Sequence, residues 1–88
     1  MGRSLIARNV RRIRIAKGVS QERLAFDSGV DRSYLGGIER EMENPTVDLL
    51  DRLAVTLGVP IAELFAEASR HERKSAGLKR GRRRIGPA

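Results

Sequence analysis

Apolar residues recur every three or four positions through the first two thirds of the chain, and this spacing predicts amphipathic α-helices. The first helix is expected over residues 4–17, with Ser4 as its N-cap and Gly18 in a left-handed conformation just after its end. No segment shows the alternation of β-branched and polar residues that is typical of a strand. The pattern therefore predicts an all-α fold. The apolar face of the first helix comprises Ile6, Val10 and Ile13.

Capping residues and a proline break place the later helices. Ser20 is expected to cap a helix over residues 21–28, and Asp31 a helix over residues 32–40. Asn44-Pro45 then interrupts the chain, because the residue before a proline is pushed out of the helical region and proline has no N–H to donate.

Two further helices are expected after this break. Thr46 would cap a fourth helix that ends at Gly58, and Pro60 would take the first position of a fifth helix that continues to about Ala68. Residues 1–69 are thus expected to form one compact five-helix domain. The apolar positions of these two helices are Leu50, Leu53, Ala54, Leu57, Ile61, Leu64 and Phe65.

Residues 21–40 have the spacing of a DNA-reading helix-turn-helix. Ala25 would let the two helices approach closely, and Gly29 can take the positive φ that the tight turn between them requires. Leu35 and Ile38 are three residues apart and are expected to face the core. The opposite, exposed face of the second of these helices is then expected to carry Ser33, Gly36, Gly37 and Arg40.

The basic charge is unevenly distributed along the chain. Residues 1–69 carry ten basic and ten acidic side chains, whereas residues 70–88 carry eight basic and one acidic. Within the domain, residues 1–38 are net basic and residues 39–69 net acidic, so the half that holds the helix-turn-helix is suited to meet phosphate. Residues 70–88 have too few apolar residues to form a core and are expected to be disordered.

Composition argues against several classes of protein. The chain has no Cys, one His and no apolar run of membrane-spanning length, so we expect no disulfide, no metal site and no transmembrane helix. Arginines interrupt the N-terminal apolar residues, which is unlike a signal peptide and predicts a cytoplasmic protein. A DNA-binding role would make it nucleoid-associated. His71 has no convergent acid or nucleophile, so we expect no enzymatic activity and no cofactor. No effector domain follows the helix-turn-helix, so no small-molecule ligand is expected.

Motifs spread over residues 8–65 form a specific combination. They are Arg14, Lys17-Gly18-Val19-Ser20-Gln21-Glu22-Arg23-Leu24-Ala25, Gly29-Val30, Tyr34-Leu35-Gly36-Gly37-Ile38-Glu39-Arg40, Asn44-Pro45-Thr46, Leu53-Ala54 and Leu57-Gly58-Val59. Together they resemble the Xre-type family of helix-turn-helix transcriptional regulators, which are lambda-repressor and Cro-like. The resemblance implies a lambda-repressor-like domain that binds double-stranded DNA.

The resemblance also implies which residues contact DNA. Gln21, at the start of its helix, would contact a phosphate; the alternative is that it only covers the helix end. Arg32 is the best direct reader, because a guanidinium can pair with guanine O6 and N7; the alternative is a solvated arginine. Base contacts fall on Arg32, Ser33, Gly36 and Gly37, and phosphate or sugar contacts on Tyr34 and Arg40.

Three features of this region have alternative explanations. Gly36-Gly37 would either keep the reading face flat or be tolerated because the helix packs well, at a cost of about 1 kcal/mol each relative to alanine. Arg14 and Glu39 would form a structural ion pair, the alternative being two independent surface charges.

Relatives often have glycine after Arg40, whereas this chain has Glu41-Met42-Glu43, whose carboxylates would repel phosphate. This loop is expected to lie away from DNA or to limit non-specific binding.

A homodimer is expected, because one recognition helix offers few base contacts. Its candidate surface is Ile61, Leu64 and Phe65, although these residues would also close the monomer core. The basic tail is a candidate DNA arm through Lys79, Arg80, Arg82, Arg83 and Arg84. The alternatives are a solvated tail and attraction to a membrane surface, and no amphipathic anchor supports the latter.

The sequence predicts a DNA-binding transcriptional regulator, a repressor or dual regulator, whose third helix enters the major groove of a palindromic operator. Within the same fold, the alternatives are an antitoxin and a controller protein of a restriction-modification system. From another class, the alternative is a protein-binding adaptor with non-specific affinity for nucleic acid.

Overall fold

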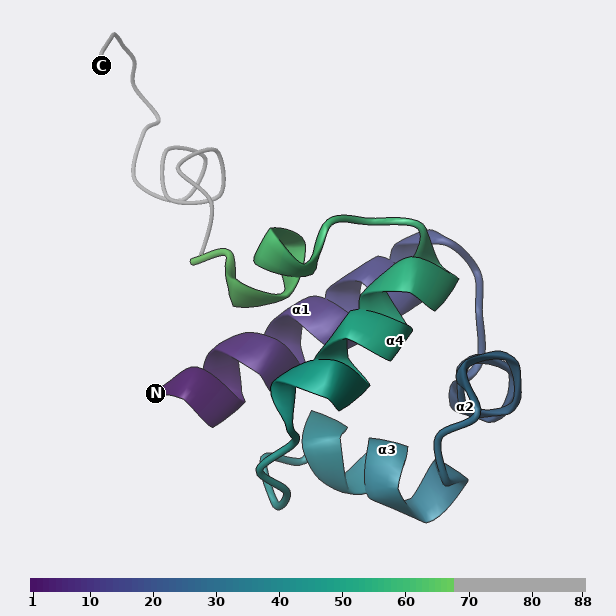
Figure 1. Cartoon of the computed structure of the whole chain (residues 1–88), viewed down its shortest axis with the longest axis horizontal. Coiled ribbons are helices and arrows are strands. Elements are labelled where there is room, and N and C mark those ends of the chain that lie inside the picture. Colours follow the sequence, from purple (N-terminus) through teal and green to yellow (C-terminus); the bar gives the residue numbers. More distant parts are fainter. Residues whose placement is uncertain (68–88) are drawn as a thin grey trace, which may run out of the picture.

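A computed structural model describes residues 1–67 of the 88-residue chain as an all-helical domain (Figure 1). Its elements are α1 (Gly2–Ala16), α2 (Gln21–Ser28), α3 (Arg32–Glu39), α4 (Val47–Leu57) and the 3-10 helix η1 (Ile61–Phe65). The all-α prediction is confirmed. No helix of the described part is long and apolar enough to span a membrane.

The start of α1 differs from the prediction. The helix begins at Gly2, with Met1 as an N-cap that makes no side-chain capping bond. Ser4 lies inside the first turn, where its hydroxyl donates to the Met1 carbonyl oxygen at 2.9 Å, so the predicted Ser4 cap is wrong. The other three predicted N-caps are confirmed, since side chains of Ser20, Asp31 and Thr46 accept backbone N–H bonds at 3.0–3.1 Å.

The fifth element is also shorter and tighter than predicted. η1 ends at Phe65, and Pro60 is its N-cap instead of its first helical residue. A side chain of α1 supplies the physical reason, because Asn9 Nδ2 donates to the carbonyl oxygens of Leu64 at 3.0 Å and Ala66 at 2.7 Å. These bonds hold the chain in an extended course at Ala66. The described part therefore has four α-helices, and the expected fifth one is a single 3-10 element.

Asn9 is completely buried, and no sequence pattern predicted its role. Its Oδ1 accepts from Arg12 Nη2 at 3.1 Å, and Arg8 Nη2 donates to the Ala66 carbonyl oxygen at 2.9 Å. Polar side chains of α1 thus hold the segment that follows α4 in place through hydrogen bonds. In Figure 1, this segment lies on the opposite side of the domain from α3.

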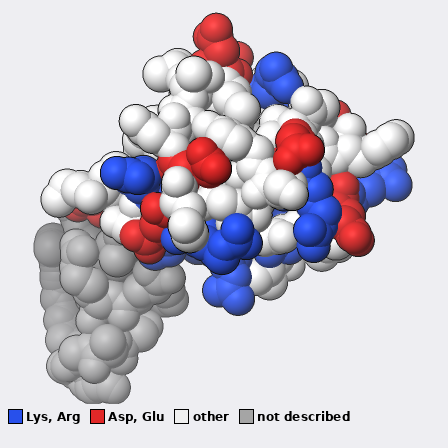
Figure 2. All heavy atoms as spheres, turned by 90° about the horizontal axis from the view of Figure 1, so that it is seen from below, with Lys and Arg blue, Asp and Glu red and all other residues white. Residues whose placement is uncertain are grey.

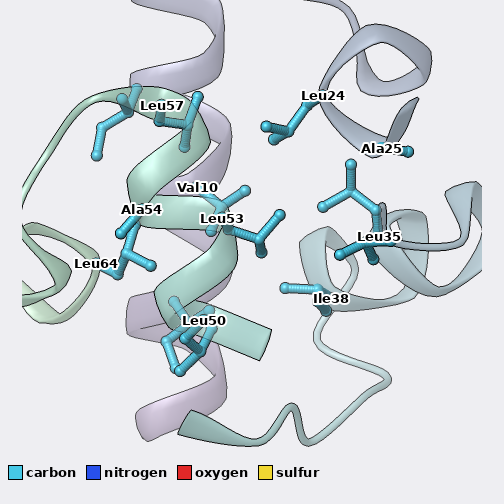
Figure 3. Packing of buried hydrophobic residues seen from close by; sticks show 13 residues of the cluster. Val10, Leu24, Ala25, Leu35, Ile38, Leu50, Leu53, Ala54, Leu57 and Leu64 are labelled. Carbon is cyan, nitrogen blue, oxygen red and sulfur yellow. The ribbon is translucent and has the colours of Figure 1, made fainter. Parts of the chain in front are cut away.

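Leucine and isoleucine side chains from every element form one core. The positions predicted to be buried in the first four helices are buried, and Leu24, Leu35 and Leu53 have no exposed surface. Figure 3 shows the side chain of Leu53, in α4, pointing toward Leu35 and Ile38 of α3. Ala25 is also buried, as close approach of α2 requires. The apolar side of α3 therefore faces this core, with α1 and α2 packed beside the helix, and its other side faces outward.

Four helices end in the same reversed turn. Gly18, Gly29 and Gly58 have positive φ values of 69°, 71° and 73°, and the N–H of the valine after each bonds to the carbonyl oxygen five residues back. At the end of α3, Glu41 takes this place with a φ of 64°. A side chain with a Cβ is strained in this left-handed conformation by about 1 kcal/mol or more.

We expect Glu41→Gly to raise the free energy of unfolding by about 1 kcal/mol, because glycine takes the left-handed conformation without strain. Thermal or urea unfolding measures the change. Glu41→Ala is the matched control, since it removes the carboxylate but keeps the Cβ. An equal gain from alanine would show that the charge, and not the backbone, is responsible.

Candidate nucleic-acid interface

The start of α3 presents two polar side chains to solvent. Arg32 and Ser33 are exposed, and the carboxylate of Asp31 accepts the backbone N–H of Tyr34 at 3.1 Å, which fixes this end of the helix. Arg32 Nε lies 3.8 Å from Glu22 Oε2, and both side chains are more than half exposed. A solvated pair of this kind is weak, so Arg32 is available to another partner.

The two glycines of α3 are not exposed, contrary to the sequence prediction. Gly36 and Gly37 are both buried, although they lie on the side of the helix away from Leu35 and Ile38. Side chains of Arg40 and Gln21 cover Gly36, and the side chain of Glu43 covers Gly37. An ideal Cβ on Gly36 would lie 3.2 Å from Arg40 Nη1, and one on Gly37 would lie 2.7 Å from the Cγ of Glu43.

A largely buried ion pair fixes the position of α3 relative to α1. Arg14 Nε and Nη2 donate to the two carboxylate oxygens of Glu39 at 2.8 and 2.9 Å, and the two side chains are 12% and 4% exposed. Arg14 Nη1 also donates to the Val19 carbonyl oxygen at 2.9 Å, in the turn before α2. One guanidinium thus joins α1, this turn and the end of α3.

Gln21 is joined to the same carboxylate. Its Nε2 donates to Glu39 Oε1 at 2.9 Å, and its Oε1 lies 3.7 Å from the Cβ that Gly36 would have. The side chain is half-buried at the first position of α2, beside α3. Its amide is therefore held in place by Glu39 while it remains partly accessible from outside.

The pKa of Glu39 reflects these contacts. Burial opposes ionisation of the carboxyl, but the hydrogen bonds from Arg14 and Gln21 and the charges of Arg14 and Arg11 outweigh it, so the pKa of Glu39 is lowered from its ordinary value of 4.5. The hydrogen bond to Glu39 likewise raises the pKa of Arg14 despite burial. Both residues are charged at neutral pH.

The remaining predicted contact residues lie at the edges of α3. Tyr34 is half-buried and packs against the core, while Arg40 is exposed and lies beside Gly36. Figure 2 looks at the domain from the side that carries α3 in Figure 1 and shows basic and acidic side chains next to one another. This face is thus not uniformly basic, and the charge near a bound ligand depends on which side chains lie next to it.

Only part of the predicted dimer surface is exposed to solvent. Leu64 has no exposed area and belongs to the core, so its assignment to that surface is wrong for this domain. Ile61 is half-buried, and Phe65 is 42% exposed. Phe26 and Val55 are more exposed than Phe65, at 82% and 70%, and were not singled out from the sequence. The proposed arm residues Lys79, Arg80, Arg82, Arg83 and Arg84, like the rest of the basic tail, lie outside the described residues.

The arrangement of these helices matches known proteins. The Helix-turn-helix family model matches residues 10–64, which is more than half of the chain. The chain belongs to the helix-turn-helix family. This match confirms the family resemblance seen in the sequence motifs.

Among relatives of this helix-turn-helix chain, the transcriptional regulator SlrR of Bacillus subtilis is 44% identical over 75 residues. The match covers 83% of this chain and 49% of SlrR, so the chain spans about half the length of that relative.

Solved structures of restriction-modification controller proteins have the same fold. C.AhdI from Aeromonas hydrophila has a TM-score of 0.70 and 44% identity, over 72% of this chain and 96% of that one. The C.Esp1396I tetramer, in complex with its natural 35 base-pair operator, has a TM-score of 0.68 and 35% identity, over 74% and 86% of the two chains.

We expect the Glu39 ion pair of this helix-turn-helix domain to make its stability depend on pH. Because the folded pKa is lowered, the stabilisation is complete above about pH 4.5 and is lost as the pH falls through the folded value. Glu39→Gln should therefore cost about 2 kcal/mol near neutral pH and progressively less below pH 4.5. Urea unfolding of both proteins across this range measures the difference, and a constant difference at every pH would contradict the assignment.

Proposed function

We propose that the chain is a sequence-specific DNA-binding transcriptional regulator that inserts α3 into the major groove of a palindromic operator. The observation that carries the proposal is the exposure of Arg32 and Ser33 at the start of a helix whose orientation is locked by the Arg14–Glu39 pair. A guanidinium at this place can pair with guanine O6 and N7, and a hydroxyl can bond to any base edge.

Contacts to the DNA backbone are assigned to Gln21, Tyr34 and Arg40. Gln21 lies at the N-terminus of α2, where backbone N–H groups and a side-chain amide suit a phosphate oxygen, and Glu39 orients that amide. Arg40 is exposed beside Gly36, so a phosphate can be reached from the end of α3. Such contacts set the register of the helix on the duplex, and Arg32 supplies one base preference.

Within this class, the likeness to C.AhdI along almost the whole of that protein favours a controller of a restriction-modification system. Such a regulator acts on the nucleoid and binds its target without catalysing a reaction. An antitoxin is the second candidate of the same fold. A protein-binding adaptor, in contrast, would have no preferred operator.

Selection of duplexes from a random pool tests the proposed function. We expect a palindromic consensus with two half-sites about one helical turn apart, and Arg32→Ala should weaken binding to it by about 1–3 kcal/mol and relax one base preference. Arg3→Ala is the matched control, because Arg3 is also an exposed helical arginine but lies at the start of α1. If the unmodified protein enriches no particular sequence, the adaptor function is favoured instead.

We further propose that two copies bind together through the exposed part of η1. Phe65 is the exposed aromatic of this element and lies in the same short helix as the half-buried Ile61. The two residues suit a small apolar contact between symmetry-related copies.

Sedimentation of the free protein tests the dimer. We expect Phe65→Ser to shift the association toward monomer, because it replaces an apolar contact by a solvated hydroxyl. Phe26→Ser, at an exposed phenylalanine of α2, should leave the association unchanged. A monomer at every concentration, or equal effects of the two variants, would rule out this surface.

A further inference from the structure

The outward face of α3 includes a side chain that does not belong to the helix. A Cβ on Gly37 would lie 2.7 Å from Glu43 Cγ and 3.3 Å from Glu43 Oε2, and real Cβ atoms essentially never approach another atom as closely as the first of these distances. Glu43 therefore occupies the space that a side chain at position 37 would need. Because position 37 points away from the core, Glu43 lies where a base-reading residue of α3 would otherwise lie.

The backbone holds Glu43 in this place. The left-handed conformation of Glu41 reverses the chain, and the N–H groups of Glu41 and Met42 bond to the carbonyl oxygens of Ile38 at 3.0 Å and Gly37 at 2.7 Å. Two residues beyond Glu43, Pro45 leads into the Thr46 cap of α4. The segment is thus anchored at both ends, and Glu43 returns over the last turn of α3.

The carboxylate of Glu43 has an unused capacity to accept hydrogen bonds. Within residues 1–67, no donor or cation is within bonding distance of it, although the side chain is half-buried. A carboxylate accepts and cannot donate, so in a major groove it bonds to an exocyclic amino group, of which cytosine N4 is the usual partner. Guanine O6 and N7 would repel it, because both are acceptors.

We propose that Glu43 is a specificity-determining residue. Its side chain, which lies over Gly37, would accept a hydrogen bond from the N4 amino group of a cytosine. This inference rests on the proposed function, since it needs α3 in the major groove. The guanidinium of Arg40 lies over the adjacent Gly36 and offsets the repulsion between the Glu43 carboxylate and nearby phosphates. The glycines at 36 and 37 make room for these two side chains.

Two variants separate base reading from a general charge effect. Glu43→Gln removes the charge with almost no change of shape, and Glu41→Gln is the matched control, because it removes the same charge two residues away in the exposed part of the loop. Duplex selection with each purified full-length chain is expected to give a cytosine preference in each half-site that falls about tenfold in Glu43→Gln and persists in Glu41→Gln. If both variants instead raise the affinity for every duplex by the same factor and keep every base preference, Glu43 only repels phosphate and the proposal is overturned.

Gly37→Ala provides a test at unchanged charge. The added Cβ must displace the Glu43 side chain, while alanine favours the helix and should leave the melting temperature equal or higher. We expect the same cytosine preference to be lost, and its retention in a folded Gly37→Ala protein would contradict the proposal.

The same selection separates the role of Glu43 from the proposed function. A consensus that Glu43→Gln retains in full would refute the role of Glu43 alone. The absence of any consensus for the unmodified protein would overturn the proposed function, and the role of Glu43 with it.

Discussion

The ion pair between Arg14 and Glu39 is the interaction on which the presentation of α3 depends. Helices of eight residues, such as α2 and α3, are marginal by themselves and need tertiary contacts to persist. The apolar core holds one side of α3, but apolar contacts alone have little directionality. The bidentate bond from Arg14, with its third bond to the turn before α2, supplies that direction. The start of α3 therefore points outward in one defined orientation.

The outward face of α3 is assembled from more than one segment. Arg32 and Ser33 come from the first turn of the helix, and Glu43 comes from the loop that follows it. The two glycines between them contribute space in place of side chains. A helix with larger residues at these positions would present its own chemistry, whereas this one presents the chemistry of the loop. This arrangement gives a physical role to the departure from the family pattern after Arg40.

Most of the fold could be predicted because its signals are local. N-caps such as Asp31 and Thr46, and the left-handed glycines at the helix ends, act within a few residues and can be recognised from spacing alone. Ser4 and the fifth helix were mispredicted because other contacts decided them. A helix can begin before its first good cap, and the carbonyl oxygens of Leu64 and Ala66 bond to Asn9, more than fifty residues away in the chain. The cover over Gly36 and Gly37 was missed for the same reason, since it depends on where side chains from α2, the end of α3 and the following loop lie.

The hydrogen bonds of Asn9 to Leu64 and Ala66 have a consequence for the order in which the domain folds. They join residues 55 and 57 positions apart, whereas each helix end is closed by bonds across five residues or fewer. Closing the longer loop costs more chain entropy, so these bonds are expected to form after the helices have assembled and to break before them. A partial opening of the domain would therefore begin at η1 and leave α3 in place.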